Sequence, residues 1–224
     1  MPFSPKTLDF LWENRMRNSR DWFEEHKSEY RSYVVEPLCE LVEALTPTML
    51  QIDSLFTVDP RVDKTISRIW RDTRYSHDKS LYRDTMWIIF KRGKMHGTEV
   101  PGFYFEITCD GFNYGCGFYH ASTNFMDTMR QQILENRSAF REALSAFAAQ
   151  TTFTIEGDCY KRPHFPDAAP ELQNWLERRN ICFIAESDDA KLLFSRDLAD
   201  VLAVDFLKLR SIYDFLLHVS MSSN

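Results

Sequence analysis

The chain has 224 residues, of which 44% are hydrophobic and 27% charged, and only 7 are glycine. This length is typical of one domain, and the composition excludes collagen-like, low-complexity and disordered chains. No apolar run approaches the roughly 20 residues of a membrane span, and residues 1–6 lack the pattern of a signal peptide. We therefore expect a soluble, cytoplasmic protein with no membrane partner. Five cysteines without a CxxC motif predict free thiols rather than disulfides or a zinc site.

The charge is distributed unevenly. Residues 61–94 contain ten basic and four acidic side chains, a net of plus 6, so the rest of the chain carries minus 12 against a total of minus 6. An acidic body disfavours binding of duplex nucleic acid, whose affinity comes largely from neutralised phosphates. A small anionic partner fits better, because 18 of the 27 basic residues are arginine, which holds phosphate or carboxylate bidentately.

Helical patterns dominate the first 50 residues. Ser4 and Pro5 predict the start of a short helix that runs to about Trp12, and a second helix should start near Asn18 or Ser19. Pro37 marks a kink or a helix restart within the second pattern. The apolar residues recur at spacings of three and four and are expected to form a core stripe: Trp22, Phe23, Tyr30, Tyr33, Val34, Leu38, Leu41, Val42 and Leu45.

The clearest strand signal is a hairpin over residues 103–118. Two apolar runs flank Asp110-Gly111, a pair that favours a two-residue turn. With that turn, one face of the hairpin is core: Phe103, Phe105, Ile107, Cys109, Phe112, Tyr114, Cys116 and Phe118. The other face places Tyr104 opposite Gly117 and Glu106 opposite Gly115. Glycines beside a carboxylate and a phenol leave a shallow bay, which a ligand could enter or which a helix or other backbone could fill.

The remaining elements complete a mixed fold. Strands are expected at residues 87–90, 153–156 and 181–185, helices at 123–136, 138–150, 170–178 and 190–219, and an irregular loop at 160–167. We predict an α+β single domain over residues 1–224, with a mostly antiparallel sheet, a central hairpin at 103–118, and helices at both ends.

Residues 66–83 concentrate the polar side chains. Arg68, Arg71 and Arg74 recur every third residue, which gives one stripe on a helix, whereas on a strand Arg68 and Arg74 share a face without Arg71. Such a density of cations needs anions. These are either the aspartates of the chain, in a lattice of ion pairs between the N-terminal helices and the sheet, or a bound ligand.

Several motifs resemble an uncharacterised bacterial and fungal family, domain-of-unknown-function family 2461. The resemblance runs from about Phe10 to Phe215 and rests on Asp21-Trp22-Phe23 with Lys27 and Tyr30, Ile66-Ser67-Arg68-Ile69, Arg71-Asp72-Thr73-Arg74-Tyr75-Ser76, Asp78-Lys79, residues 115–119, and Lys161-Arg162-Pro163. It implies a stand-alone domain with no established activity, substrate or cofactor. The chain departs from the family pattern at Tyr75, Leu81, Cys116 and residues 167–170.

Other chemistries have weaker signals. The six histidines are scattered without an HExxH motif, GxSxG is absent, and so is any glycine-rich phosphate loop. We therefore predict no metal and no cofactor.

The leading hypothesis is a protein that binds, and possibly acts on, a small phosphate- or carboxylate-bearing molecule; whether it is an enzyme stays open. The expected ligand-binding residues are Arg68, Arg71, Arg74, Lys79, Arg83, Tyr104, Gly115 and Gly117. Asp72 or Glu106 is the candidate general base, and Tyr119 or His120 the candidate acid. The alternatives are an interaction protein whose Arg/Asp cluster is a structural ion-pair scaffold, and a metal-assisted phosphoesterase using Asp72, Asp78 and Glu106.

Overall fold

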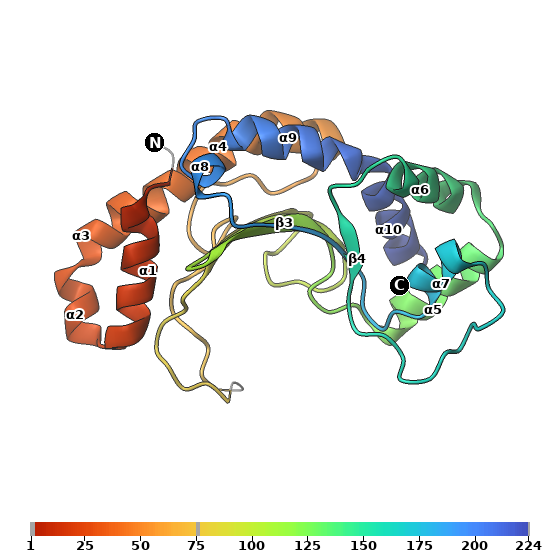
Figure 1. The fold of residues 1–224 in the computed structure, drawn as a ribbon, viewed down its shortest axis with the longest axis horizontal. Helices are drawn as coiled ribbons and strands as arrows, with labels where there is room; N and C mark the ends of the chain where they lie inside the picture. The colour runs from red at the N-terminus through yellow and green to blue at the C-terminus, as the bar shows by residue number, and fades with distance from the viewer. Residues whose placement is uncertain (1–2, 75–76, 224) are drawn as a thin grey trace. The chain divides into compact units, whose positions relative to one another are not determined.

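A computed structural model describes residues 3–74 and 77–223 (Figure 1). Three strands follow the N-terminal helices in sequence, and two more strands lie among the later helices. The strands are β1 (Met86–Lys91), β2 (Gly102–Thr108), β3 (Gly111–Gly117), β4 (Thr154–Glu156) and β5 (Cys182–Ser187), in the sheet order β1-β2-β3-β5-β4. The N-terminal helices are α1 (Pro5–Arg17), α2 (Arg20–Glu25), α3 (Lys27–Tyr30), the π-helix η1 (Arg31–Val35) and α4 (Glu36–Ile52). The later helices are α5 (Thr123–Leu134), α6 (Ser138–Ala148), α7 (Pro170–Leu176), α8 (Ala190–Leu193), α9 (Leu198–Lys208) and α10 (Arg210–Ser222). The predicted α+β class with an antiparallel sheet is confirmed.

The contacts within the chain define two compact units. The first unit contains residues 1–90, 104–113 and 186–203, and the second contains residues 91–103, 114–185 and 204–224. That all 224 residues form one domain stays a prediction.

The N-terminal helices of the first unit pack through aromatic rings. The Phe10 ring of α1 lies 5.6 Å from the ring of Trp22 and 5.8 Å from that of Tyr30. The predicted restart at Pro37 is confirmed, because η1 ends at Val35 and α4 begins with Pro37 in its first turn. A proline costs nothing there, since the first amides of a helix have no intrahelical acceptor. The predicted stripe of Leu38, Leu41, Val42 and Leu45 is buried.

The hairpin is confirmed, but its turn lies one residue earlier than predicted. β2 ends at Thr108 and β3 begins at Gly111, so Cys109 and Asp110 form the connection. Glu106 consequently accepts a hydrogen bond from the Asn113 side chain and is not opposite Gly115. Cys109, predicted to be a core residue, is half-buried in the turn. The reason is Gly111: at φ +153° it lies within β3, and a Cβ there would be 2.4 Å from the carbonyl oxygen of Ser187 at the end of β5. The other predicted core residues of the hairpin are buried.

The glycine positions of β3 in the second unit are filled by a neighbouring strand. A Cβ on Gly115 would lie 1.9 Å from the carbonyl oxygen of Phe183, and one on Gly117 would lie 2.7 Å from Cα of Cys182. The close approach of β5 therefore explains why these residues have no side chains. At Gly115 and Gly117, the space that the sequence assigned to a ligand or to other backbone is filled by the backbone of β5.

A second aromatic core holds the helices of the second unit. The Trp175 ring of α7 lies 5.4 Å from Phe140 of α6 and 5.1 Å from Phe183 of β5, and Phe140 lies 5.4 Å from Phe215 of α10. Figure 1 shows α5, α6, α7 and α10 gathered near the C-terminus. Across residues 3–74 and 77–223, no helix has the length and apolar character needed to span a membrane.

Candidate functional site

The arginine-rich segment forms a short two-stranded ladder rather than a regular helix or strand. Trp70 bridges Tyr82 in antiparallel fashion, the Arg71 amide donates to the carbonyl of Leu81 at 2.8 Å, and the Arg83 amide donates to the carbonyl of Ile69 at 2.8 Å. The Trp70 and Tyr82 rings are 4.5 Å apart. We call residues 69–71 and 81–83 the arginine ladder, and the described residues between them in sequence, 72–74 and 77–80, its closing loop.

The α1 helix is tied to this closing loop by Arg15. Its Nη1 donates to Oγ of Ser80, and its Nη2 lies 3.0 Å from Oδ2 of Asp78. The Asn18 side chain at the C-terminal end of α1 accepts a hydrogen bond from the Leu81 amide at 2.6 Å. Three polar contacts from the end of α1 therefore hold the ladder and its closing loop.

Arg71 is held only loosely by the carboxylates near it. Its Nη2 lies 3.5 Å from Oδ2 of Asp78 and 3.7 Å from Oδ1 of Asp84, distances longer than a good charge-assisted hydrogen bond. Its Nε is buried and has no hydrogen-bond partner within residues 3–74 and 77–223, although the side chain is 24% exposed. Arg71 is thus a cation whose hydrogen-bonding capacity is largely unused. Arg15, Arg71, Asp78 and Asp84 form what we call the Arg71 cluster.

Two further side chains of the first unit have buried polar atoms without partners. Both amide atoms of Asn14, in α1, and the hydroxyl of Tyr82, in the arginine ladder, lack hydrogen bonds to any described residue. Burial raises the pKa of the Tyr82 hydroxyl. An unsatisfied buried polar group costs about 1–3 kcal/mol. All three such side chains described in the first unit, those of Asn14, Arg71 and Tyr82, therefore belong to α1 or to the arginine ladder.

Arg68 and Arg74, by contrast, are paired. Arg68 Nε lies 2.7 Å from Asp63, while Arg74 donates to both carboxylate oxygens of Asp72 at 3.0 and 2.7 Å. The side-chain hydrogen bonds from Arg74, with one from its backbone amide, hold the Asp72 pKa well below its usual range. A carboxylate with so low a pKa is a weak proton acceptor near neutral pH.

The two remaining cations of the predicted set interact with the protein. Lys79 Nζ donates to the carbonyl of Thr73 at 2.7 Å. The Arg83 guanidinium lies 4.3 Å from the ring centre of Trp87, a cation–π contact.

The hairpin residues of the predicted site divide between the two units. Glu106 in the first unit is half-buried and accepts a hydrogen bond from the Asn113 amide at 3.0 Å, and Tyr104 is half-buried on the same strand. Gly115, Gly117, Tyr119 and His120 belong to the second unit. Tyr119 is 99% exposed, and His120 is also exposed.

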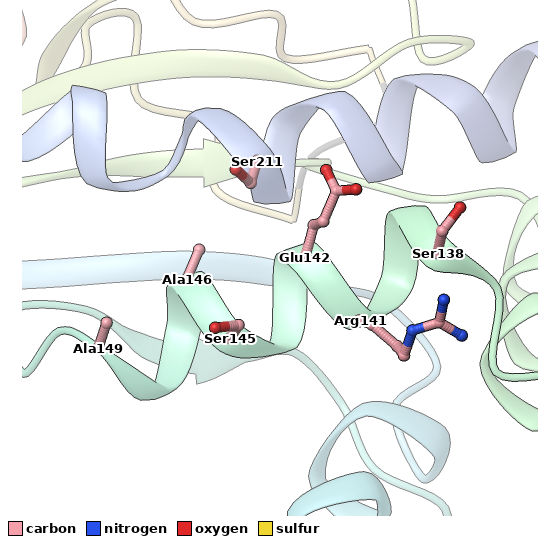
Figure 2. Close-up of a pocket in the computed structure, with 7 residues that line it drawn as sticks. All are labelled: Ser138, Arg141, Glu142, Ser145, Ala146, Ala149 and Ser211. Atoms are coloured by element: carbon pink, nitrogen blue, oxygen red, sulfur yellow. The ribbon is translucent and has the colours of Figure 1, made fainter.

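Two surface depressions are lined by none of the predicted site residues. One, of about 470 Å³, is lined by α6 residues that include Arg141 and Glu142 and by Ser211 of α10. Figure 2 shows the Arg141 and Glu142 side chains pointing in different directions, so they do not converge on a ligand position. The other, of about 380 Å³, lies between α4 and residues 195–199. The second is lined by Pro37 and Leu41, which the sequence placed at the helix restart and in the core stripe.

The sequence of this chain matches a protein-family model over most of its length. The model of DUF2461, described as a conserved hypothetical protein, matches residues 6–215. The chain belongs to this family. A search of curated proteins gave no match.

The DUF2461 motifs of this chain occupy the structural positions described above. Asp21-Trp22-Phe23 lies on α2, where Phe23 packs 5.0 Å from the ring of Tyr82. Tyr75 and Ser76, also part of the predicted family pattern, lie outside the described residues. The prediction missed Arg15, which contacts Asp78 from more than 60 positions earlier in the sequence, and it gave no site role to Asp84, which directly follows Arg83.

For a metal, no suitable cluster of three or more His, Cys, Asp or Glu side chains occurs in the part of this DUF2461 chain that the structure describes. Asp72 and Asp78 contact arginines instead, and Glu106 contacts Asn113.

Proposed function

We propose that the chain binds a small phosphate- or carboxylate-bearing molecule at the Arg71 cluster. The observation that carries this proposal is Arg71 itself, a mostly buried guanidinium with an unpartnered Nε and with carboxylate oxygens no nearer than 3.5 Å. An oxyanion that entered the cluster would supply the hydrogen bonds that Asp78 and Asp84 leave unmade. Arg15 also contacts the Asp78 carboxylate, so the guanidinium groups of Arg15 and Arg71 would share the ligand.

In this proposal Asp78 is an internal competitor for the two arginines. Its side chain is 38% exposed and also accepts the Ser80 amide at 2.9 Å, so it can yield Arg71 to a stronger anion without losing its own backbone contact. Asn14 of α1 and Tyr82 of the ladder also have buried polar atoms without partners, and buried polar groups normally have a hydrogen-bond partner.

The test is isothermal titration calorimetry with inorganic phosphate, a hexose phosphate and succinate. We expect one class of probe to bind, Arg71→Ala to weaken it at least about tenfold, and Asp78→Asn to strengthen it. Arg74→Ala is the matched control, because it removes the same charge from an exposed pair nearby and should change the affinity less than about twofold. Absence of binding by all three probes, or equal losses in both arginine variants, would overturn the proposal.

A second candidate is favoured by the pairing of the other arginines. Arg68 with Asp63, Arg74 with Asp72 and Arg15 with Asp78 form the ion-pair scaffold expected of a non-enzymatic interaction protein. Its exposed aromatic side chains, such as Trp12 at 57% exposure, would then contact a partner. This scaffold predicts that Arg71→Ala and Asp78→Asn both lower the melting temperature, and that no anion raises it.

For the third candidate, metal-assisted phosphoester hydrolysis, the described residues of the first unit offer no group of carboxylates free to bind a metal. The carboxylates it needs are engaged by Arg15, Arg74 and Asn113.

A further inference from the structure

The loop between β4 and α7, residues 157–169, has an irregular backbone that the following helix end holds in place. The Glu177 carboxylate accepts the His164 amide at 2.9 and 3.0 Å and the Phe165 amide at 2.6 Å. Arg178 donates to the carbonyls of Gly157 at 2.6 Å and Ile155 at 2.8 Å. We call residues 157–169 the basic loop. Because its conformation is fixed in advance, binding a ligand there would cost little ordering of the backbone.

The basic loop presents a stack of side chains. The His164 imidazole lies 3.8 Å from the ring of Tyr160 at an interplanar angle of 15°. The guanidinium of Arg130, a residue only 6% exposed, lies 5.1 Å from the same tyrosine ring and donates to the carbonyl of Leu176 at 3.0 Å. The half-buried tyrosine ring thus contacts a buried, hydrogen-bonded guanidinium, and the exposed imidazole lies nearly parallel to it. A flat, fixed ring at the surface is a stacking platform.

Two cations lie between the stacked residues in sequence. Lys161 and Arg162 are exposed, and neither side chain has an ion pair or hydrogen bond with any residue the structure describes. They differ in this respect from Arg68 and Arg74, whose charges are neutralised by aspartates. Asp158 and Asp167 are also exposed on the loop, while the Glu177 charge is directed at backbone amides. The two free cations therefore remain available to an external anion.

We propose that the basic loop binds a mononucleotide, with the base stacked on His164 and the phosphate held by Lys161 and Arg162. Stacking is tolerant of base identity, and lysine and arginine together suit a phosphate. The loop offers two free cations on a chain of net charge minus 6, which suits one phosphate group better than a polyanion. This site lies wholly in the second unit and is independent of the Arg71 cluster.

The test is titration of the full chain with AMP at neutral pH and low salt, with adenosine and inorganic phosphate as partial ligands. We expect AMP to bind at least about tenfold more tightly than either, and the His164 ring protons to shift upfield as the base stacks. His164→Ala and the double variant Lys161→Ala/Arg162→Ala should each lose at least about tenfold in affinity. All three side chains are exposed, so these variants should fold, and circular dichroism verifies that they do.

Two controls separate this site from others. His120→Ala removes an exposed imidazole of the same unit, and Arg71→Ala removes the anion site proposed above; both should leave AMP binding unchanged. The proposal is overturned if AMP binds no more tightly than phosphate. It is also overturned if His120→Ala loses as much AMP affinity as His164→Ala, or if Arg71→Ala loses AMP affinity. Tighter binding of a single-stranded decanucleotide than of AMP, after correction for the number of sites, would overturn the choice of a mononucleotide.

Discussion

Nη2 of Arg15 lies 3.0 Å from Oδ2 of Asp78, and this contact joins the first helix to the loop that closes the arginine ladder. The same carboxylate oxygen lies 3.5 Å from Nη2 of Arg71. One aspartate is therefore shared by two guanidinium groups from separate parts of the sequence, and its protonation affects both.

Acid should weaken the fold through Asp78. Hydrogen bonding from the Ser80 amide, then from Ser80 and Arg15 side chains, holds the Asp78 pKa below its usual range. The folded state therefore binds the proton less readily than the unfolded state, so this contribution is present above about pH 4 and is lost as the pH falls below it. We expect Asp78→Asn to reduce the fall in melting temperature between about pH 5 and pH 3. Asp9→Asn, an exposed control on α1, should not. A fall in Asp78→Asn equal to that of the parent would contradict this.

Gly115→Ala should destabilise the sheet strongly. The new Cβ would meet the backbone oxygen of Phe183 at 1.9 Å, and backbone in a central strand cannot move aside as a flexible side chain can. We expect a loss of about 3 kcal/mol in the free energy of unfolding, measured with urea. The control is Gly93→Ala, because no atom lies within 4 Å of the Cβ that would be added there. Only the backbone φ of +73° disfavours alanine at that position, and we expect it to lower the free energy of unfolding by about 1 kcal/mol. Equal losses in the two variants would show that β5 does not approach β3 this closely.

Tyr114→Phe should remove a buried hydrogen bond in the second unit. The Tyr114 hydroxyl donates to Asp205 Oδ2 at 2.6 Å, while Lys208 holds the other carboxylate oxygen at 2.6 Å. A buried hydrogen bond to a charged group contributes about 1.5–3 kcal/mol, and we expect a loss of that size in urea unfolding. Tyr119→Phe is the control, because that side chain is 99% exposed and its removal should cost less than about 0.5 kcal/mol.

The cysteines should react with iodoacetamide in a fixed order. Burial, with Asp84 and Asp110 nearby, raises the pKa of Cys109 to about 11, so little thiolate is present at pH 8. Cys159 is exposed, whereas Cys116 is buried and its pKa is raised well above the ordinary value by that burial. Mass spectrometry of the native chain should find Cys159 alkylated first and Cys116 last. Modification of Cys109 as fast as Cys159 would show that the hairpin turn is open.

The elements were predictable where local patterns determine them. The stripe from Leu38 to Leu45 and the alternation from Phe103 to Phe118 each match the face that is buried, because the periods of helix and strand are fixed by backbone geometry. The register of the hairpin was not predictable from its turn residues. Gly111 looked like a turn glycine, yet β5, more than 70 positions later in sequence, requires it inside a strand.

The candidate site was predictable only in part. The sequence indicated that Arg71 matters, but its three-residue spacing from Arg68 and Arg74 suggested equivalent roles. Exposed Asp63 and Asp72 pair with those two neighbours, whereas Arg71 shares Asp78 with Arg15 of a separate helix. Such tertiary partners have no local signature. The same holds for the stack of Tyr160 on His164, which depends on Arg130 and Glu177 from other elements.

The anchoring of the basic loop by Glu177 and Arg178 has a consequence for proteolysis. The peptide bond after Lys161 is exposed and is a trypsin site by sequence, while the bond after Arg162 is protected by Pro163. A protease must draw several residues of its substrate into an extended conformation, and here the amides of His164 and Phe165 are held by a carboxylate. Cleavage after Lys161 therefore requires local opening of this segment, so the rate of nicking reports how often α7 and its loop separate in the native protein.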